Sequence, residues 1–493
     1  MSNLQQEKAK MTNQRWTICL MLFLATTVNY LDRQVLSLTW ADFIAPEFHW
    51  TNSDYGLVAG LFSLFYAVSM LFAGKFVDRL DTKKGYLWAI GVWSVGAVIH
   101  AFCGLLTSGI VAGEWTASFA GAREAISTVG DVSMVVSVSV TLFIFARLVL
   151  AIGEAGNFPA AIKATAEYFP KKDRAYATSL FNAGAQIGAL IAPLTIPFIA
   201  KAWGWEMAFI IIGALGFVWM GFWVIVYEKP EKNKRVNAAE LAYITQDDIT
   251  DAAAATAAGS TPVNANDNAG KKVTFKQAFR HKQTWSFAVG KFLTDGVWWF
   301  LLFWIPAYLS SVYGLDSTQS APHVFLVYAI SMISVFAAGY FPQYFMKKKK
   351  LDPYQGRMRA MLLFAMFPLL ILFAQPLGTV SVWLPVIIIG IAAAAHQSWS
   401  ANIFTTVSDM FPKYAVGTIT GIGGMAGGVG SYFINQGSGM LFDFTANNNT
   451  KFMGFQGIES GYFIIFCVCA FAYLIGWFIM KSLVPKYQLI TEM

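Results

Sequence analysis

Charged residues are scarce in this chain. Asp, Glu, Lys and Arg together make up 13% of its 493 residues, whereas hydrophobic residues make up 56%. A soluble globular protein carries roughly 25% charged residues, so this chain cannot cover a folded core with a surface that faces water. The shortage excludes a soluble protein. It also excludes a nucleic-acid-binding protein despite the net charge of +7, because no aqueous face is available. The lipid bilayer is the solvent that suits this composition.

Features of enzymes and metalloproteins are missing as well. The four cysteines, Cys19, Cys103, Cys467 and Cys469, fall in apolar stretches and show neither a disulfide pattern nor a metal-binding pattern. The glycine-rich stretch 421–430 is not a phosphate-binding loop, since no Lys-Ser/Thr follows it. No nucleophile–base motif is present in the sequence. We therefore expect no enzyme activity, no cofactor and no metal.

Long apolar runs, in contrast, are abundant. A membrane-spanning helix needs about 20 mostly apolar residues. Twelve such stretches run near 16–40, 52–73, 85–106, 137–166, 175–200, 206–227, 285–312, 322–345, 358–376, 379–408, 414–440 and 460–481. Transmembrane strands would instead give short segments of alternating hydrophobicity. The first stretch lacks a small-residue cleavage site, so we expect no removable signal peptide. The sequence predicts an all-α integral membrane protein with twelve transmembrane helices.

Lysine and arginine concentrate in every second loop. After the second stretch come Lys75, Arg79, Lys83 and Lys84, and after the fourth come Lys171, Lys172 and Arg174. After the eighth come Lys347 to Lys350, Arg357 and Arg359. The alternate loops hold more acidic residues, among them Glu47, Glu124 and Asp443. Because Lys and Arg favour the cytoplasmic side of a membrane, we expect both chain ends to lie inside the cell.

The twelve stretches divide into two similar sets of six. Glu-Tyr-Phe-Pro-Lys at 167–171 recurs as Asp-Met-Phe-Pro-Lys at 409–413, and Gly188 and Gly430 keep the same register. Parallel repeats of this kind are typical of transporters whose binding site lies near mid-membrane between the halves. We predict a first six-helix bundle at 1–227, a cytoplasmic linker at 228–284 with a disordered part at 252–270, a second bundle at 285–493, and an inserted external loop near 107–135 that can hold a short surface helix.

Three segments resemble a known family. Residues 74–84 read Gly-Lys-Phe-Val-Asp-Arg-Leu-Asp-Thr-Lys-Lys and resemble the loop 2–3 signature of the major facilitator superfamily, although Asp81 stands where that pattern usually has Gly. Residues 29–33 (Asn-Tyr-Leu-Asp-Arg) and the segment 147–159 are similar to the anion:cation symporter branch of this superfamily. The resemblance implies the major facilitator fold, with two six-helix bundles.

Residues 290–299 and 395–402 look like hexuronate transporters within that branch. The likeness covers nearly the whole chain except 107–135, 228–270 and the two ends. It implies a proton-coupled symporter that imports galacturonate or glucuronate through a bacterial inner membrane by alternating access. Its partners would be the hexuronate, protons and the lipid bilayer, and we expect a monomer. A symporter for another organic anion, such as an aldonate or an aromatic acid, and a transporter-like membrane sensor are the alternatives.

Ionisable residues deep in the spans are the first site candidates, because each costs about 2.5–3.5 kcal/mol to insert. Asp32 and Arg33 are adjacent, hence about 100° apart on a helix, and can face different partners. The resemblance implies that Asp32 takes up a proton and that Arg33 binds the substrate carboxylate. The planar guanidinium group of arginine suits this role, because it can donate two parallel hydrogen bonds to a carboxylate. It also implies a second proton site at Glu154, whose charged form Arg147 stabilises. The alternatives are a structural ion pair and a Glu that holds a kink near Pro159.

The second half offers candidate substrate contacts. Lys291 and Asp295 are spaced i, i+4, and their pair either opens to admit an anion or only neutralises itself. A sugar needs amide groups for its hydroxyls and a flat indole for its C–H face. The candidates of this type are Trp298, His396, Gln397, Trp399 and Asn402. His396 is also a candidate protonation site, although a lone histidine in a bundle is often a satisfied core residue.

Five further residues complete the candidate set. The resemblance implies that Tyr66 contacts the substrate. Asn182 and Gln186 share one helix face at i, i+4 and can bind hydroxyl groups. Asp78 and Arg79 lie in a loop predicted to face the cytoplasm, where we expect them to form a gate contact.

Overall fold

The computed structural model describes residues 11–247 and 273–490. In these two ranges most of the chain is helical, and the hairpin of β1 (Lys451–Phe452) and β2 (Phe455–Gln456) forms the one sheet. The prediction of an all-α fold is confirmed. The disordered linker predicted at 252–270 lies outside the described residues.

Among the described residues, six membrane-length segments make up the first half. They are α1 (Gln14–Thr39), which continues into the π-helix η1 (Trp40–Ile44) and the short α2 (Ala45–Phe48), α3 (Asn52–Leu80), α4 (Thr82–Val111), α6 (Val132–Glu154) with α7 (Asn157–Tyr168), α8 (Lys171–Trp203) and α9 (Trp205–Val226). The short helices α5 (Phe119–Ser127) and α10 (Ala238–Ile244) lie outside these segments.

The second half repeats this arrangement in the described part of the chain. The short α12 (Phe275–Ala278) precedes α13 (Lys282–Tyr313), α14 (Ser317–Ser331) with α15 (Ser334–Lys349), α16 (Pro353–Met366) with η3 (Phe367–Phe373) and α17 (Ala374–Gly378), α18 (Trp383–Met410), α19 (Lys413–Asn447) and α20 (Ile458–Leu483). Ten of the twelve segments are long and apolar enough to cross a membrane. The other two are α1, which carries several polar side chains, and α19, which is rich in glycine.

A shared Phe-Pro-Lys sequence shapes the same turn in both halves. Pro170 is the N-cap of α8 and Pro412 is the N-cap of α19, and both have an extended backbone, as do the phenylalanines before them. Proline biases the preceding residue away from helix, and at a helix start its missing N–H is not needed. The repeated sequence therefore ends one helix and begins the next at equivalent places.

The fourth segment is broken directly after Glu154. Pro159 has no N–H to donate to the carbonyl of Ala155, four residues earlier, so the helix loses a hydrogen bond there. As a result α6 ends at Glu154 and α7 begins at Asn157. The break places the Glu154 carboxylate at a helix end inside the bundle.

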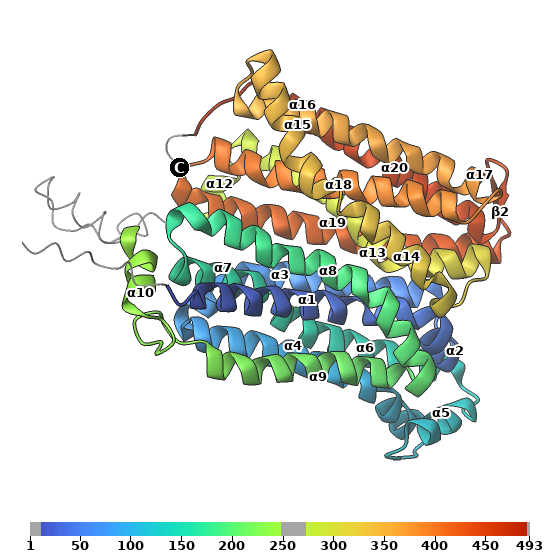
Figure 1. Cartoon of the computed structure of the whole chain (residues 1–493). Coiled ribbons are helices and arrows are strands. Elements are labelled where there is room, and N and C mark those ends of the chain that lie inside the picture. Colours follow the sequence, from blue (N-terminus) through green and yellow to red (C-terminus); the bar gives the residue numbers. More distant parts are fainter. Residues whose placement is uncertain (1–10, 248–272, 491–493) are drawn as a thin grey trace, which may run out of the picture.

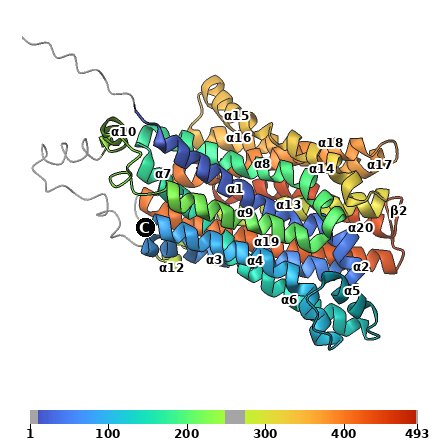
Figure 2. The same cartoon turned by 60° about the horizontal axis from the view of Figure 1, so that its bottom comes forward.

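The two halves pack side by side, and Figure 1 shows the first half in blue to green below the second half in yellow to red. The short helices α10 and α12 lie at one end, which we call the terminal end because the described chain also begins and ends there. The helix α2 and the β1–β2 hairpin lie at the opposite end, which we call the far end. The helix α5, from the predicted insertion, protrudes at this far end (Figure 2).

The halves are closed against each other at the far end. The carboxylate of Asp443, on α19, accepts hydrogen bonds from the backbone N–H groups of Asn52 (3.0 Å) and Ser53 (2.7 Å) in the first turn of α3. Asp42 accepts from the N–H of Ser317, the first residue of α14, at 2.5 Å. Each carboxylate lies at a helix N-terminus, where unpaired N–H groups and the helix dipole stabilise negative charge. These contacts join the halves across the far end.

Glycine allows α3 and α19 to approach closely at this end. A Cβ atom on Gly439 would lie 2.2 Å from the backbone oxygen of Asn52, so even alanine would force the two helices apart. A Cβ atom on Gly437, two residues earlier on α19, would meet nothing within 4 Å. Alanine at Gly439 should therefore disturb the contact between α3 and α19, whereas alanine at Gly437 should not.

We expect Gly439→Ala to separate the far ends of α3 and α19 and to lower the melting temperature of the protein. Overpacking of this kind costs about 1–3 kcal/mol. Thermal melting in detergent, together with distances between spin labels at the far ends of the two helices, measures both effects. Gly437→Ala is the matched control and should leave both unchanged. Equal behaviour of the two variants would contradict the close contact.

Candidate functional site

A cavity of about 200 Å³ lies between the two halves. The helices α1 and α3 form one wall, and α13, α18 and α19 form the other. Seven of the predicted substrate-binding residues line it, namely Arg33, Tyr66, Lys291, Asp295, Trp298, His396 and Gln397. Larger hollows at the far end and the terminal end contain none of these seven residues. The cavity is therefore where the buried charged and aromatic side chains of the two halves meet.

Arg33 is the central residue of the first wall. Its Nε and Nη2 atoms donate to Oε2 of Glu154 at 2.9 and 2.6 Å. The rings of Tyr30, Tyr66 and Trp299 lie 4.7–5.0 Å from its guanidinium carbon. Arg33 is 3% exposed and Glu154 is fully buried, and a buried pair needs such compensating contacts because both charges have lost their water. Arg33 thus connects the cavity to a carboxylate behind its wall.

Asp32 and Arg147 lie behind the same wall. Both are buried, and neither lines the cavity. Asp32 lies within electrostatic range of Glu154 and Arg147. With Arg33 these residues form a buried group of two acids and two bases, which we call the charge cluster and define as Asp32, Arg33, Arg147 and Glu154. The cluster is neutral when all four side chains are charged, so a proton added to either carboxylate leaves it with a positive charge.

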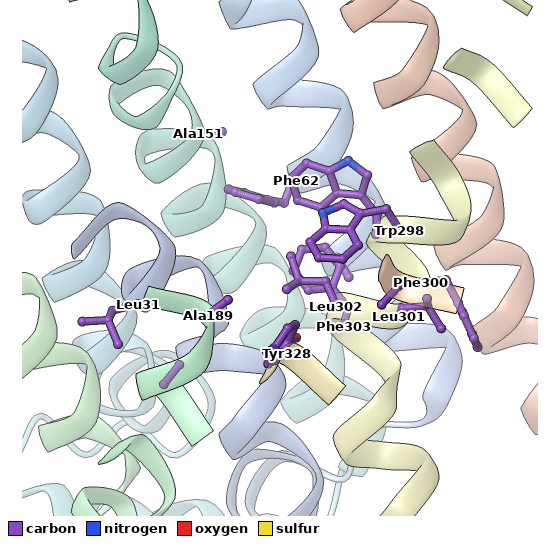
Figure 3. Close-up of a cluster of buried hydrophobic side chains, with 14 of the residues drawn as sticks. Leu31, Phe62, Ala151, Ala189, Trp298, Phe300, Leu301, Leu302, Phe303 and Tyr328 are labelled. Atoms are coloured by element: carbon purple, nitrogen blue, oxygen red, sulfur yellow. The ribbon is translucent and has the colours of Figure 1, made fainter. Parts of the chain in front are cut away.

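The ring of Phe62 lies close to both guanidinium groups of the charge cluster. Its centroid is 5.0 Å from the guanidinium carbon of Arg147 and 5.8 Å from that of Arg33. Phe62 and Trp298 belong to the cluster of buried hydrophobic side chains in Figure 3, where α3 of the first half meets α13 of the second. Phe303 belongs to the same cluster, and its ring lies 6.2 Å from that of Phe62. Aromatic packing thus surrounds the charge cluster on its side toward the second half.

The side chain that hydrogen-bonds to Glu154 is not the one that the family resemblance named. The resemblance implies that Arg147, two turns earlier on the same helix, stabilises the ionised carboxylate, and that role stays a prediction. In the described structure the hydrogen bonds to Glu154 come from Arg33 on α1, and Arg147 acts on Glu154 only through space. A rise of about 10 Å separates two helical turns, which is too far for a direct bond. The packing of α1 against the broken fourth segment decides the pairing.

The opposite wall combines a charged pair with a flat stack of rings. Nζ of Lys291 lies 2.6 Å from Oδ2 of Asp295, one turn along α13. Trp298 stacks on His396, with ring centroids 5.2 Å apart and planes 7° from parallel. Nδ1 of His396 lies 2.7 Å from the hydroxyl of Tyr473 on α20, which holds the imidazole in place. This wall therefore offers a cation, a carboxylate and a flat ring surface side by side.

Two predicted substrate residues on α18 lie away from the cavity walls. The amide nitrogen of Asn402 donates to the backbone oxygens of Ala338 (3.0 Å) and Ser398 (2.9 Å), so its donors are used within the second half. Trp399 is fully buried, and its ring packs edge-to-face on that of Tyr473 with centroids 5.5 Å apart. Trp399 packs against the same tyrosine that holds His396, and neither Trp399 nor Asn402 lines the cavity. They support the wall in this conformation instead of forming it.

The remaining predicted residues lie outside the cavity. On α8, Asn182 is exposed, and Gln186 accepts a hydrogen bond from Ser331 of the second half at 3.4 Å. At the terminal end, Asp78 pairs with Lys163 of its own half at 3.2 Å, and Arg79 is exposed. Their predicted roles in hydroxyl binding and gating would require other conformations.

Several cavity residues were absent from the sequence-based set. Tyr30, Trp299 and Ser400 line the cavity. Tyr30 lies one turn before Arg33 on α1, so its helical spacing is a signal that could have identified it. Tyr473, which holds His396, is one of two tyrosines in the apolar helix α20 and carries no comparable signal.

Comparisons with known proteins agree with this architecture. The chain is 28% identical to a hexuronate transporter of Escherichia coli over 88% of this chain and 89% of that protein. It is 26% identical to a galacturonate transporter of Dickeya chrysanthemi over 70% and 86% of the two chains. A bacterial homolog of the human lysosomal transporter Spinster, crystallised in an inward-facing and unoccupied conformation, superimposes with a TM-score of 0.68 at 18% identity, covering 97% of this chain and 99% of that one.

The family model that describes the Major Facilitator Superfamily matches residues 22–434, which is most of the chain. The predicted resemblance and the predicted fold are confirmed by this match and by the fold of the Spinster homolog. The protein is a multi-pass membrane transporter and not an enzyme. The chain belongs to the Major Facilitator Superfamily.

Proposed function

We propose that the protein is a proton-coupled symporter that imports hexuronates, such as galacturonate and glucuronate, by alternating access. One observation carries the proposal. Arg33 lines the cavity and also donates two hydrogen bonds to the buried carboxylate of Glu154. The names of the hexuronate and galacturonate transporters that resemble this chain support the choice of a sugar acid.

Competition for Arg33 couples the proton to the substrate. An ionised Glu154 accepts hydrogen bonds from two nitrogen atoms of the Arg33 guanidinium. A substrate carboxylate must therefore compete with Glu154 for the same donor groups. A proton on Glu154 removes its charge and releases Arg33 to the substrate. Because coupling between two binding sites is reciprocal, bound substrate must in turn favour the protonated form of Glu154. Proton and anion therefore load together, and the negative charge of the substrate balances the positive charge that the proton adds to the cluster.

The second wall fits the rest of a sugar acid. Gln397 and Ser400 line the cavity and can donate to and accept from hydroxyl groups. The ring of Trp298, stacked on His396, offers a flat surface for the C–H face of a pyranose. A volume of about 200 Å³ corresponds to roughly six or seven water molecules at about 30 Å³ each, which suits a small polar molecule.

The closed far end indicates which state of the transport cycle this structure represents. We infer that the terminal end faces the cytoplasm, because the Lys- and Arg-rich loops lie there and such loops favour that side. The far end then faces outward, and Asp443 and Asp42 hold it shut in this state. Opening to the outside requires both carboxylates to leave the helix N-termini that they cap. A bacterial inner membrane is the location that fits the relatives from Escherichia coli and Dickeya chrysanthemi.

Uptake by the purified protein in proteoliposomes tests the proposal. Labelled galacturonate or glucuronate should enter faster when the outside is more acidic than the inside, and a protonophore should remove the difference. Uptake that proceeds without regard to the pH gradient would contradict proton coupling. Failure of every hexuronate to bind or enter would contradict the substrate class.

A sugar diacid is a second candidate substrate, because Arg33 and Lys291 approach the cavity from opposite walls. A molecule with a carboxylate at each end can contact both cations, whereas a hexuronate contacts one. Competition of galactarate and gluconate against labelled galacturonate distinguishes these classes. Stronger competition by galactarate than by unlabelled galacturonate would favour the diacid, and stronger competition by gluconate would favour an aldonate.

A further inference from the structure

Asp295 is a carboxylate inside the substrate cavity, and the transport cycle above gives it no role. Its Oδ2 atom lies 2.6 Å from Nζ of Lys291, and both residues line the cavity. The side chain of Asp295 is 15% exposed, whereas that of Glu154, the carboxylate that holds Arg33, is fully buried. On both walls a carboxylate therefore neutralises the cation that a substrate anion would contact. On the second wall this carboxylate itself lies in the cavity.

The surroundings of Asp295 leave it dependent on Lys291. In the described part of the chain, Lys291 is the one cation that forms an ion pair with it. The backbone of α19 packs against the carboxylate, since a Cβ atom on Gly427 would lie 2.3 Å from Oδ2. Nζ of Lys291 also lies 4.1 Å from the ring centroid of Phe404 on α18. The lysine thus keeps a favourable aromatic contact when Asp295 loses its charge.

Other titratable groups near Asp295 come from the helices around it. His396 on α18 lines the same cavity, and Tyr473 on α20 lies within electrostatic range of Asp295. The residues of α19 that line the cavity are glycines. The opposite wall, from α1 and α3, adds Tyr30, Arg33 and Tyr66. A proton on His396 would place a second cation near Lys291, whereas a proton on Asp295 removes a negative charge from the cavity.

An ionised Asp295 opposes the entry of a second carboxylate. The charge cluster and the Lys291–Asp295 pair are each neutral when all their side chains are charged. A substrate carboxylate that takes Lys291 would leave Asp295 as an unpaired negative charge next to another one, in a largely buried site. A proton on Asp295 reverses this effect. The neutral acid gains an O–H donor, so a substrate carboxylate can accept hydrogen bonds from Asp295 and Lys291 together.

A hexuronate does not need this proton. Once its single carboxylate contacts Arg33, it presents hydroxyl groups to the second wall. An ionised Asp295 can accept from one hydroxyl while Lys291 donates to another, and hydrogen bonds to charged groups are the stronger kind. A sugar diacid of nearly the same size brings its second carboxylate to this place instead. The charge on Asp295 therefore distinguishes the two classes of substrate, and the cavity volume does not.

We propose that Asp295 is a proton-binding residue that admits sugar diacids, and that a diacid is transported with one proton more than a hexuronate. The proposal rests on the proton coupling through Glu154 proposed above. One O–H bond forms on the Asp295 carboxylate with a proton from the solution, and this bond breaks when the proton leaves on the opposite side. Because Asp295 lines the cavity, it meets the same solution as the substrate and needs no separate route for the proton.

Binding of galactarate and galacturonate to the purified protein across a pH series tests the extra proton. Both acids stay ionised between about pH 6 and pH 8, because carboxyl groups titrate near pH 3–4 or so. In wild type, the affinity for galactarate should rise up to about tenfold more than that for galacturonate for each unit by which the pH falls. In Asp295→Asn, the rise for galactarate should be smaller than in wild type by the same factor.

Asp409→Asn is the matched control. Asp409 lies 2.6 Å from Arg357 in an equally close pair, but it lies outside the cavity. This variant should bind both acids with the pH dependence of wild type. Galacturonate binding to Asp295→Asn checks that its cavity is intact.

Uptake by proteoliposomes under a membrane potential gives an independent readout, because the extra proton cancels the extra negative charge of the diacid. In wild type, an inside-negative potential should act equally on the uptake of galactarate and of galacturonate. In Asp295→Asn each galactarate enters with one proton fewer. A potential of about 60 mV should then lower galactarate accumulation about tenfold relative to wild type. A merely structural defect would slow uptake without changing its response to the potential.

One extra proton with galactarate in wild type, and its loss in Asp295→Asn, support the proposal. Retention of the extra proton in Asp295→Asn overturns it. Equal proton counts for the two acids in wild type, or no binding of galactarate at any pH, also overturn it and leave the hexuronate symport standing. Galacturonate binding to wild type that does not depend on pH overturns the proton coupling and this proposal together.

Two further variants decide if Asp295→Asn binds neither acid. Asp32→Asn and His396→Asn each remove another group that could take the extra proton. Loss of the extra proton in either variant would place it on that residue and overturn the proposal. Retention in both supports its assignment to Asp295.

Discussion

Replacing Arg33 by lysine should lower hexuronate uptake by about 100-fold or more, even though the positive charge is kept. Lysine cannot form the two parallel hydrogen bonds that a guanidinium offers a carboxylate, and it stacks less well on aromatic rings. Arg33 uses both properties, since it donates two hydrogen bonds to Glu154 inside a cage of Tyr30, Tyr66 and Trp299. Losing a hydrogen bond to a charged group costs about 1.5–3 kcal/mol, and 1.4 kcal/mol corresponds to a factor of ten.

Binding of galacturonate to the purified variant and uptake by proteoliposomes measure the loss. Arg15→Lys is a matched control, because Arg15 lies on the same helix α1 and pairs with a buried carboxylate, Glu240, at 3.1 Å outside the cavity. The control should transport within about two-fold of wild type, as expected for a site that does not contact substrate. Equal uptake by Arg33→Lys and wild type would remove Arg33 from the substrate site.

Most of the fold could be predicted from sequence features that recur along the chain. The apolar stretches predicted all twelve membrane-length segments, and the duplicated Phe-Pro-Lys sequence predicted the two halves because proline restricts the backbone in the same way wherever it occurs. Even α1 and α19, the least apolar segments, could be placed from the sequence. Their polar and small residues are buried against the other helices and need little lipid-compatible surface.

The composition of the candidate site was also largely predictable. Ionisable residues are expensive in lipid, so the few that occur deep in the spans had to lie at a shared interior surface. Seven predicted substrate residues from α1, α3, α13 and α18 indeed line one cavity. Spacing within a helix predicted the Lys291–Asp295 pair correctly, because residues four apart always face each other.

Contacts between helices could not be predicted in this way. The bond between Arg33 and Glu154 joins α1 to the fourth segment, and the capping of α3 by Asp443 joins the two halves. Both depend on how helices far apart in the sequence pack together, which hydropathy and spacing do not describe. Asn402 shows the same limit, since its amide has the chemistry of a sugar contact but is used by the backbone oxygen of Ala338 on a neighbouring helix.

Replacing Glu154 by glutamine should abolish proton-driven accumulation of substrate and leave exchange of substrate intact. Glutamine keeps the size of the side chain but cannot ionise, so it imitates the protonated carboxylate and no longer competes electrostatically for Arg33. In the wild type, one coupled proton makes substrate affinity rise by up to about tenfold for each unit by which the pH falls, while Glu154 is ionised in the free protein. In Glu154→Gln the affinity should be as high as that of the protonated wild type and should not change with pH.

Galacturonate binding measured across a pH series, together with counterflow and uphill uptake in proteoliposomes, separates these effects. Glu240→Gln is the matched control, since Glu240 is equally buried and paired with Arg15 but lies outside the cavity, and its pH dependence should follow the wild type. A Glu154→Gln protein whose substrate affinity still rises as the pH falls would show that another group, with Asp32 the first to examine, carries the coupled proton. If that variant instead loses binding at every pH, Glu154 holds Arg33 in place for the substrate, and the competition between the two carboxylates does not exist.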